Sequence, residues 1–435
     1  MTTALRLTQS SSERSFHYLP GVARDVDVAV LGATGVTGRR VVAYLASRAR
    51  ETNSRWVAAG RDPEKVRRVL AQEGVHEPEV VVADIARPES LKALAERARV
   101  VLNLVGPYAP SGRDVVAACV EAGAHYADIS GEMQFIRRVI KEFDEAARTA
   151  GVKVVQPAGF ESLPPDLLVR ALAERATERF QEPLDEVELE ARMKLPPGLP
   201  RPTDGMSGGT AQTMIAALLD DDAAVAIDPA ALIADSDRAE HVRRVSPIKV
   251  RPRRGTEGNV IAPMQPVAFI NPAVIQRSAE LSGDPPFRYR EGTALPGAGA
   301  MRAPSLVLAG ILGGLQALQR SSVHASPAAR RRYARMMSAV MPESGFGPRP
   351  DRLEGWTWSM TVHARTTGGH TVEGHVSGSG HVGYLATARM IGETGLLLSE
   401  DGATPSAAGC LPPSLALGTT DLSRFTPAGL MFDID

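Results

Sequence analysis

Three glycines recur at a spacing of three in the segment Gly32-Ala33-Thr34-Gly35-Val36-Thr37-Gly38. A short apolar run precedes this segment and a stretch with apolar residues at helical spacing follows it, which predicts a strand, a tight turn and a helix. In such a turn the first glycine permits the bend, the second lets a pyrophosphate approach the backbone, and the third lets helix and strand pack closely. The N-terminus of the helix supplies N–H groups for the anion. The segment therefore predicts dinucleotide contacts from Gly32, Thr34, Gly35, Val36, Thr37 and Gly38.

Arg61 stands about twenty residues further on, where an NAD site would present a carboxylate to the ribose. A guanidinium there can pair with a 2′-phosphate, and Lys65 would add a second positive charge one helical turn later. These residues favour NADPH over NADH as the cofactor. The alternative is a solvated helix start, with Asp62 as N-cap before Pro63.

Two further segments follow predicted strands of the same sheet. Asp84 would lie near the adenine edge or would cap the helix that begins at Pro88. Gly106 and Pro107 would lie beside the nicotinamide ribose, and Tyr108 would point into the cleft as the candidate proton donor. The alternative for these three residues is an ordinary turn with an exposed aromatic side chain.

The loop Gly159-Phe160-Glu161-Ser162 faces the same edge. We expect Phe160, Glu161 and Ser162 to contact the substrate, although Ser162 and Asp166 could instead cap the following helix. Tyr384, on a late helix, would line a substrate cavity or face solvent, as would Arg389. Four histidines fall within 19 residues, but alternate residues of a strand point to opposite faces, so we expect no metal site. They are His363, His370, His375 and His381.

Continuous apolar strands alternate with helical segments through the first part of the chain. This pattern is typical of an α/β fold with a Rossmann-type doubly wound parallel sheet. After residue 172 the rhythm changes to alternating strands, including a hairpin over residues 355–380, which predicts a second α+β domain for the substrate. Residues 235–303 show little periodicity and are expected to form long loops around a site.

These patterns divide the chain into four parts. Residues 1–24 form a flexible N-terminal extension, 25–175 the NADP-binding Rossmann domain and 176–400 the α+β substrate domain. Residues 401–435 would form a C-terminal segment that packs back on the Rossmann domain. The apolar segment 304–318 is expected to be a helix packed in the core, with a helix at a lipid surface or lining an acyl chain as the alternative.

The composition narrows the classes of partner. The 49 Lys and Arg nearly balance the 50 Asp and Glu, which argues against nucleic acid as a partner. Two cysteines are too few for a disulfide framework, and no segment reaches the length of an apolar membrane span, so we expect a cytoplasmic protein.

Several motifs, in order along the chain, carry a family resemblance. They are GATGVTGR, AGR, NLVGPY, GRDVVAACVEAGAHYADISGE and QPAGFESLPPDL, followed by GHVSGSGHVGYLATARMIGETGLLL and PPSLALG. Together they resemble the saccharopine dehydrogenase-like oxidoreductases, in particular the bacterial branch that includes the mycobacterial trans-acting enoyl reductases. Relatives commonly have Asp where this chain has Glu161, and Ser where it has Thr213.

The resemblance implies an NADPH-dependent enzyme that reduces a carbon–carbon double bond of a polyketide- or lipid-like substrate, free or bound to a carrier protein. A synthase or carrier protein would then be a partner, and the chain could form a homodimer. Two alternatives stay open. The first is a saccharopine-type reduction of an imine, which would require clustered cations such as Arg251, Arg253 and Arg254. The second is a non-catalytic NADP-binding, lipid-associated protein.

Overall fold

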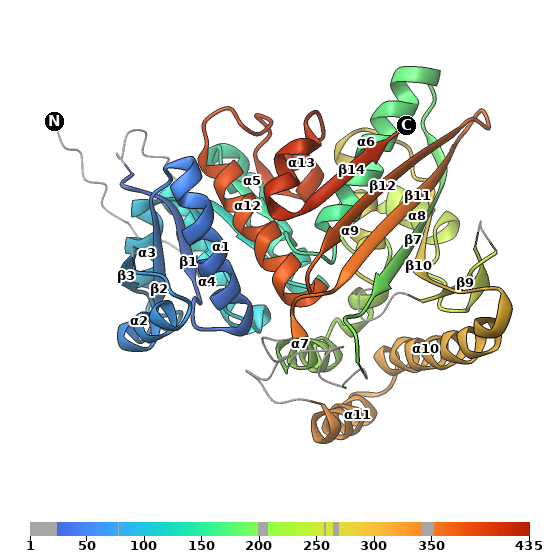
Figure 1. The fold of residues 1–435 in the computed structure, drawn as a ribbon, viewed down its shortest axis with the longest axis horizontal. Coiled ribbons are helices and arrows are strands. Elements are labelled where there is room, and N and C mark those ends of the chain that lie inside the picture. Colours follow the sequence, from blue (N-terminus) through green and yellow to red (C-terminus); the bar gives the residue numbers. More distant parts are fainter. Residues whose placement is uncertain (1–23, 77, 199–207, 256–257, 264–268, 342–351) are drawn as a thin grey trace.

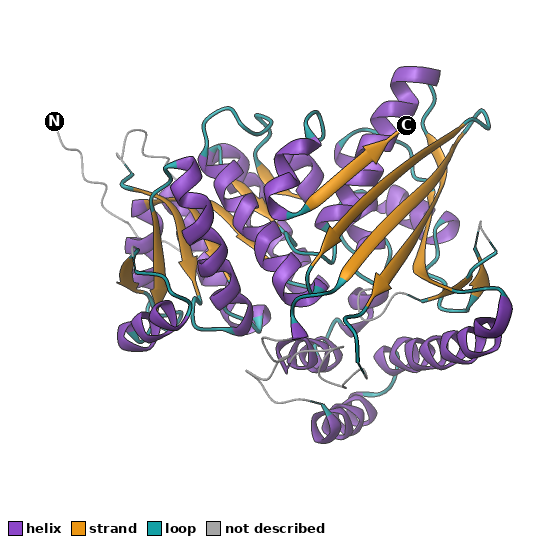
Figure 2. Cartoon of the chain, in the orientation of Figure 1, coloured by secondary structure: helices purple, strands orange, loops and turns teal. Residues whose placement is uncertain are grey.

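The computed structural model describes residues 24–76, 78–198, 208–255, 258–263, 269–341 and 352–435. Most of the predicted N-terminal extension therefore lies outside the described residues. The described chain folds into two seven-stranded sheets with helices around and between them (Figures 1 and 2). An α/β fold with a doubly wound parallel sheet, as predicted, is confirmed.

The first sheet is parallel throughout, in the order β13-β6-β5-β4-β1-β2-β3. Its strands are rich in β-branched residues, and all but the edge strand β3 are largely buried by crossover helices. The strands are β1 (Val26–Leu31), β2 (Trp56–Gly60), β3 (Glu79–Val82), β4 (Ala98–Asn103), β5 (His125–Asp128), β6 (Lys153–Val155) and β13 (Gly409–Leu411).

Two layers of helices cover this sheet (Figure 1). One layer consists of α3 (Pro88–Arg97), α4 (Tyr108–Ala122) and α5 (Met133–Ala150). The opposite layer includes α1 (Val36–Thr52) and α12 (Thr387–Ser399), with α2 (Pro63–Gln72) beside β2 and β3. α4 begins at Tyr108, where the carboxylate of Glu132 accepts the backbone N–H groups of Tyr108 and Ala109 at 2.8 Å and caps the first turn.

The second sheet is mixed, in the order β14-β12-β11-β7-β10-β9-β8. β7 runs parallel to β10 and the other neighbouring pairs are antiparallel. The predicted hairpin is confirmed as β11 and β12. The strands are β7 (Leu184–Lys194), β8 (Arg253–Arg254), β9 (Val260–Ala262), β10 (Arg288–Leu295), β11 (Thr357–Thr366), β12 (Thr371–Ser379) and β14 (Leu430–Ile434).

The remaining helices pack on or beside the second sheet. α6 (Leu163–Phe180) contacts β11, β12 and α9 (Asn271–Leu281), while α13 (Pro413–Leu417) packs on α6. α8 (Ser236–Val245) precedes the strand β8. α7 (Gly208–Leu219), α10 (Arg302–Val323) and α11 (Pro327–Val340) lie together along the lower edge of Figure 1.

Residues 235–303 do not form long loops, so that expectation was wrong. They contain α8, β8, β9, α9 and β10. α9 is buried almost all round, from Asn271 to Ala279, and therefore has no polar face to reveal a helical period.

The elements near the C-terminus are divided between the two sheets. α12 was expected in the substrate domain, but it packs against α1, β1 and β4 of the first sheet. Of the C-terminal segment, β13 extends the first sheet beside β6, whereas β14 pairs with β12 in the second. The buried side chains of α1, α6, α12 and the second sheet form one continuous core.

Candidate functional site

The glycine turn has the geometry that a dinucleotide turn requires. Gly32 has φ +94°, in the left-handed region that favours glycine. A Cβ on Gly38 would lie 2.2 Å from the carbonyl oxygen of Gly32, so any side chain there would clash with backbone. Gly35 is the N-cap of α1, and no side chain of the described residues caps that terminus. The first turn of α1 is therefore available to a phosphate.

The register of the first sheet brings the predicted cofactor segments to one edge. Leu31 pairs with Ala59 of β2 and Asn103 of β4, and Asn103 pairs with Asp128 of β5. Because these strands are parallel, the segments that follow them leave the sheet side by side. The glycine turn, Arg61 and the Gly106-Pro107 segment thus share the carboxyl edge.

Arg61 and Lys65 are exposed beside this edge, and neither forms an ion pair with a described residue. Asp62 accepts the backbone N–H of Lys65 at 3.0 Å and is the N-cap of α2, with Pro63 in the first turn. The cap and a phosphate site are compatible, because the cap uses the backbone of Lys65 and leaves its ammonium free to bind an anion.

Asp84 does not cap the helix that begins at Pro88, which corrects that alternative. Its carboxylate accepts the backbone N–H of Ala86 at 3.0 Å, and the N-cap of α3 is Arg87. A tight turn thus holds the carboxylate before the helix starts.

Tyr108 lines a cavity beside the cofactor edge with its ring, but its phenol hydroxyl is already engaged in a hydrogen bond. The hydroxyl donates to the carbonyl oxygen of Asn103 at 3.1 Å, and the ring stacks on Phe135. Burial raises the pKa of Tyr108 well above its ordinary value, and the carboxylates of Asp128 and Glu132 raise it further. Donation by Tyr108 would require that bond to break, so the geometry argues against the role of proton donor.

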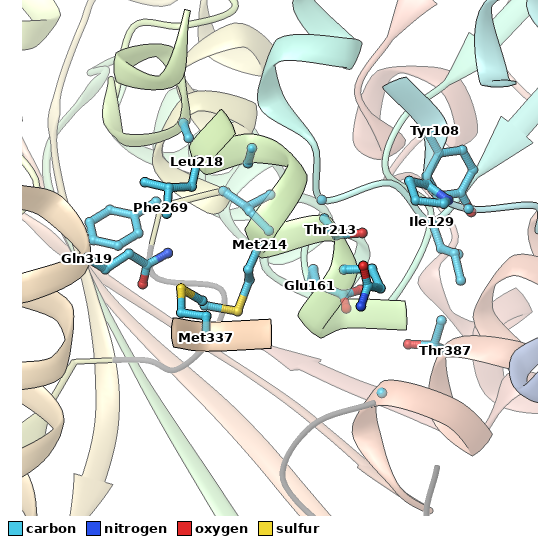
Figure 3. A pocket seen from close by; sticks show the side chains of 18 of the residues that line it. Tyr108, Ile129, Glu161, Thr213, Met214, Leu218, Phe269, Gln319, Met337 and Thr387 are labelled. Atoms are coloured by element: carbon cyan, nitrogen blue, oxygen red, sulfur yellow. The ribbon is translucent and has the colours of Figure 1, made fainter. Parts of the chain in front are cut away.

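A cavity of about 330 Å³ extends from the cofactor edge of the first sheet to the helices α7, α10 and α11 (Figure 3). One end is lined by Gly35, Val36 and Thr37 of the glycine turn with Gly106 and Pro107. The other end is lined mainly by apolar side chains, which are Met214, Leu218, Ile227, Phe269, Val323 and Met337. The described lining includes no Lys or Arg. A volume of this size suits a small-molecule ligand.

Glu161 is the carboxyl group of this cavity. In Figure 3 it lies between Met214 on one side and Thr387 on the other. Its buried Oε2 has no hydrogen-bond partner among the described residues, and burial raises the pKa of Glu161 to about 7. A Cβ on Gly159 would lie 2.8 Å from Oε2, so the glycine permits this close approach. At neutral pH a large fraction of Glu161 is protonated and able to donate a proton.

Phe160 and Ser162, the sequence neighbours of Glu161, are buried in the fold and do not face the cavity. Phe160 is buried edge-on against Trp358, with ring centroids 4.9 Å apart, and Ser162 is buried with its hydroxyl 2.9 Å from Oδ1 of Asn271. Neither lines the cavity, so their expected substrate contacts were wrong. Ser162 and Asp166 make no side-chain cap either, since Asp166 instead accepts the backbone N–H of Ser414 and the hydroxyl of Ser278.

Tyr384 does line the cavity, as expected. Arg389 does not line it, and its guanidinium donates to the carbonyl oxygen of Ser379 at 3.3 Å. Within the described part of the chain, no group of His, Cys, Asp and Glu side chains could hold a metal ion. Arg253 pairs with Glu188 at 2.8 Å, away from the cavity.

Sequence reasoning missed two components of the site. Glu132 caps α4 next to the cavity and accepts a hydrogen bond from Thr213 at 3.4 Å. The apolar wall comes from α7, α10 and α11, and the sequence did not indicate which faces of these helices would line a ligand. Thr213 and Glu161, the two departures from common family residues, both line the cavity.

Comparisons with known proteins agree with this geometry. Residues 28–155 match the family model of the saccharopine dehydrogenase NADP binding domain. A trans-acting enoyl reductase of Mycobacterium ulcerans is 30% identical over 428 residues, which cover 94% of this chain and 97% of the relative. The chain belongs to the saccharopine dehydrogenase-like oxidoreductases. A trans-acting enoyl reductase of Mycobacterium leprae is likewise 30% identical, over 431 residues and with the same coverage of both chains.

Among solved structures, the apo saccharopine dehydrogenase (L-Glu forming) of Saccharomyces cerevisiae covers 94% of this chain and 99% of its own length, with 13% identity and a TM-score of 0.49. The family model and the relatives make this family member an NADPH-dependent oxidoreductase. Its own residues fit the cofactor. The uncapped start of α1 would bind the pyrophosphate, and the exposed cations Arg61 and Lys65 would bind the 2′-phosphate.

Proposed function

We propose that this family member is an ene reductase that reduces a conjugated carbon–carbon double bond in an apolar acyl or polyketide-like chain. The observation that carries the proposal is the single cavity that joins the cofactor turn to an apolar chamber, with Glu161 between them. An apolar chamber is suited to an acyl chain, whereas the multiply charged substrate of a saccharopine-type reaction requires cations. The described lining offers none.

Held by the glycine turn with Arg61 and Lys65, NADPH would supply a hydride for the β-carbon of the double bond. Gly106 and Pro107 would form the wall beside its nicotinamide end, and the apolar side chains of α7 and α11 would exclude water from the reacting carbon. The resulting enolate needs a proton at its α-carbon, which we assign to the carboxyl group of Glu161. The O–H bond of Glu161 breaks, a C–H bond forms at the α-carbon, and the carboxylate then takes a new proton from water.

The position of Glu161 suits a proton donor. Burial keeps its pKa at about 7 rather than near 4.5, so the acid form is present at neutral pH. The other titratable side chains of the described lining are the tyrosines Tyr108, Tyr333 and Tyr384. Burial raises the pKa of Tyr108 and of Tyr333, which makes both poorer acids.

The names of the relatives support this assignment, since both are called trans-acting enoyl reductases. By analogy we propose that the substrate chain is presented by a carrier protein or a synthase in the cytoplasm. We also propose a homodimer as the form to test first by light scattering.

The test is the oxidation of NADPH, followed near 340 nm, with conjugated enoyl thioesters of increasing chain length. Substrate-dependent oxidation should appear with long enoyl thioesters, and NADPH labelled with deuterium at the transferred position should place the label on the β-carbon of the product. Oxidation of NADPH with mixtures of an amino acid and an oxo acid, without reaction of any enoyl thioester, would refute the proposal in favour of imine reduction.

A further inference from the structure

α10 turns its apolar face outward. Six large apolar residues of this helix are exposed, among them Val307 (64%), Ile311 (56%) and Leu315 (55%). Residues spaced by three and four lie on one side of a helix, so these side chains form a continuous stripe along α10. This spacing joins Val307, Leu308, Ile311, Leu315 and Leu318, which we call the α10 stripe, and Leu306 is exposed outside it. The expectation of a helix packed in the core was therefore wrong.

Apart from Val323, the buried residues of α10 are small or polar. Ser305, Ala309, Gly313 and Gln316 are buried, α10 packs on β9 of the second sheet, and a Cβ on Gly313 would lie 3.0 Å from the carbonyl oxygen of Val250. This is the reverse of an ordinary surface helix, which buries its apolar face. Residues 299–323 are long and apolar enough to span a membrane by length and composition. Because one face is packed on protein, α10 presents only the other face to its surroundings.

The charged residues of α10 and α11 themselves have one sign. Residues 292–341 contain six Arg and no Asp or Glu. Arg302, Arg331, Arg332 and Arg335 are exposed and form no ion pair with a described residue. Met336, 56% exposed, lies on the same face of α11 as Arg332 and Arg335. An apolar stripe on one helix, with exposed arginines on the helix that contacts it, is the pattern of a surface that lies in the interface of an anionic membrane.

A second copy of the chain fits this surface less well. A twofold dimer through the α10 stripe would bring two identical arginine groups together without acidic partners from α10 or α11, and like charges repel. Anionic lipid headgroups, by contrast, would neutralise the arginines while the stripe enters the acyl boundary.

We infer that α10 and α11 dock this protein on an anionic membrane surface. The same two helices line the cavity from the inside, through Gln319 and Val323 of α10 and Tyr333 and Met337 of α11. The docked surface therefore lies across one helical layer from the apolar chamber. A lipid substrate would then enter from the membrane, a statement that rests on the proposed function, whereas docking itself does not.

The test is flotation of the full chain, without substrate, with vesicles of phosphatidylcholine alone or of phosphatidylcholine with phosphatidylglycerol. We expect at least about tenfold more bound protein on the anionic vesicles, with loss of the difference at high salt. The triple variant Val307→Ser, Ile311→Ser, Leu315→Ser should lose about tenfold or more of that binding. The double variant Arg331→Glu, Arg332→Glu should lose a similar amount.

The matched control is the double variant Val82→Ser, Met431→Ser, which removes two comparably exposed apolar side chains from strands of the two sheets. It should bind vesicles like the parent chain. Thermal melting and NADPH binding should be unchanged in all variants, because only exposed side chains differ.

Three outcomes would overturn the inference. The parent chain could fail to float with anionic vesicles, or the triple variant could float equally well. Light scattering could also show a dimer that the triple variant dissociates, which would assign the α10 stripe to a second copy. Because the vesicles carry no substrate, failure of the reductase proposal would leave this result unaffected.

Discussion

The two ends of the cavity are built in different ways. At the cofactor end, Gly35, Val36 and Thr37 are consecutive residues at the N-cap and first turn of α1, directly after β1. At the chamber end, the lining comes from α7, α10, α11 and the segment around Phe269, which are far apart in the chain. The cofactor end depends on backbone geometry, so a single added methyl group is harmful there. The chamber end depends on side-chain volume and tolerates change in proportion to size.

The largest effect on cofactor binding is expected from Gly38→Ala. The new Cβ would lie 2.2 Å from the carbonyl oxygen of Gly32, and moving that backbone would cost about 3 kcal/mol, or roughly 100-fold in the dissociation constant of NADPH. Fluorescence titration with NADPH measures it. The control is Gly310→Ala in α10, where a Cβ meets nothing within 4 Å. Equal binding by both variants would contradict the assignment of the turn.

Glu161 lies between the two ends of the cavity, and Glu161→Gln tests the chemical step separately from cofactor binding. The variant should lower kcat by roughly 10²–10³-fold and leave NADPH binding intact, because the amide cannot donate the proton as an acid. In the parent chain kcat should fall as the pH rises through about 7, where Glu161 loses its proton, and the variant should lack that fall. A pH profile shared by parent and variant would show that another group supplies the proton.

The same substitution should change the pH dependence of stability. The folded pKa of Glu161 is raised to about 7, so the native state retains a proton that the unfolded chain releases near 4.5. Stability from this group is present at low pH and is lost as the pH rises through 7. Urea unfolding at pH 5 and pH 8 should therefore show a smaller loss in Glu161→Gln than in the parent chain. An equal loss would place the ionised carboxylate in a solvated position.

A moderate effect is expected for the double variant Arg61→Ala, Lys65→Ala. Loss of charge-assisted contacts to the 2′-phosphate should raise KM for NADPH about 10–100-fold and leave KM for NADH nearly unchanged. The ratio of the two KM values is the measurement. A parallel rise for both cofactors would mean that the cations act on a group common to both.

The smallest effect is expected in the chamber, from Met214→Trp. The larger side chain should shorten the space for an acyl chain and raise KM about tenfold for long enoyl thioesters, with little change for short ones. Leu219→Trp is the control, since Leu219 is exposed on the same helix and does not line the cavity. Loss of the chain-length difference would place the substrate elsewhere.

Much of the first sheet could be predicted from the sequence. Its strands are apolar runs bounded by glycine and polar residues, and the helices between them have clear apolar faces. α9 and α10 could not be predicted in the same way. α9 is buried on all sides and so lacks a period, and α10 is apolar on the face that the fold leaves exposed. Hydrophobic content cannot distinguish these cases, because burial depends on partners that are distant in the chain.

The sequence by itself determined the cofactor turn, because Gly32, Gly35 and Gly38 act through local backbone geometry within seven residues. It also determined the exposed cations that follow β2. Only the tertiary structure decided the roles of the carboxyl and phenol groups. Tyr108 is bound to the carbonyl of Asn103, Glu132 caps α4, and Glu161 lies in the cavity with a buried, unpaired oxygen. Burial and hydrogen-bond partners set the acidity of such groups, and both arise only when distant elements pack together.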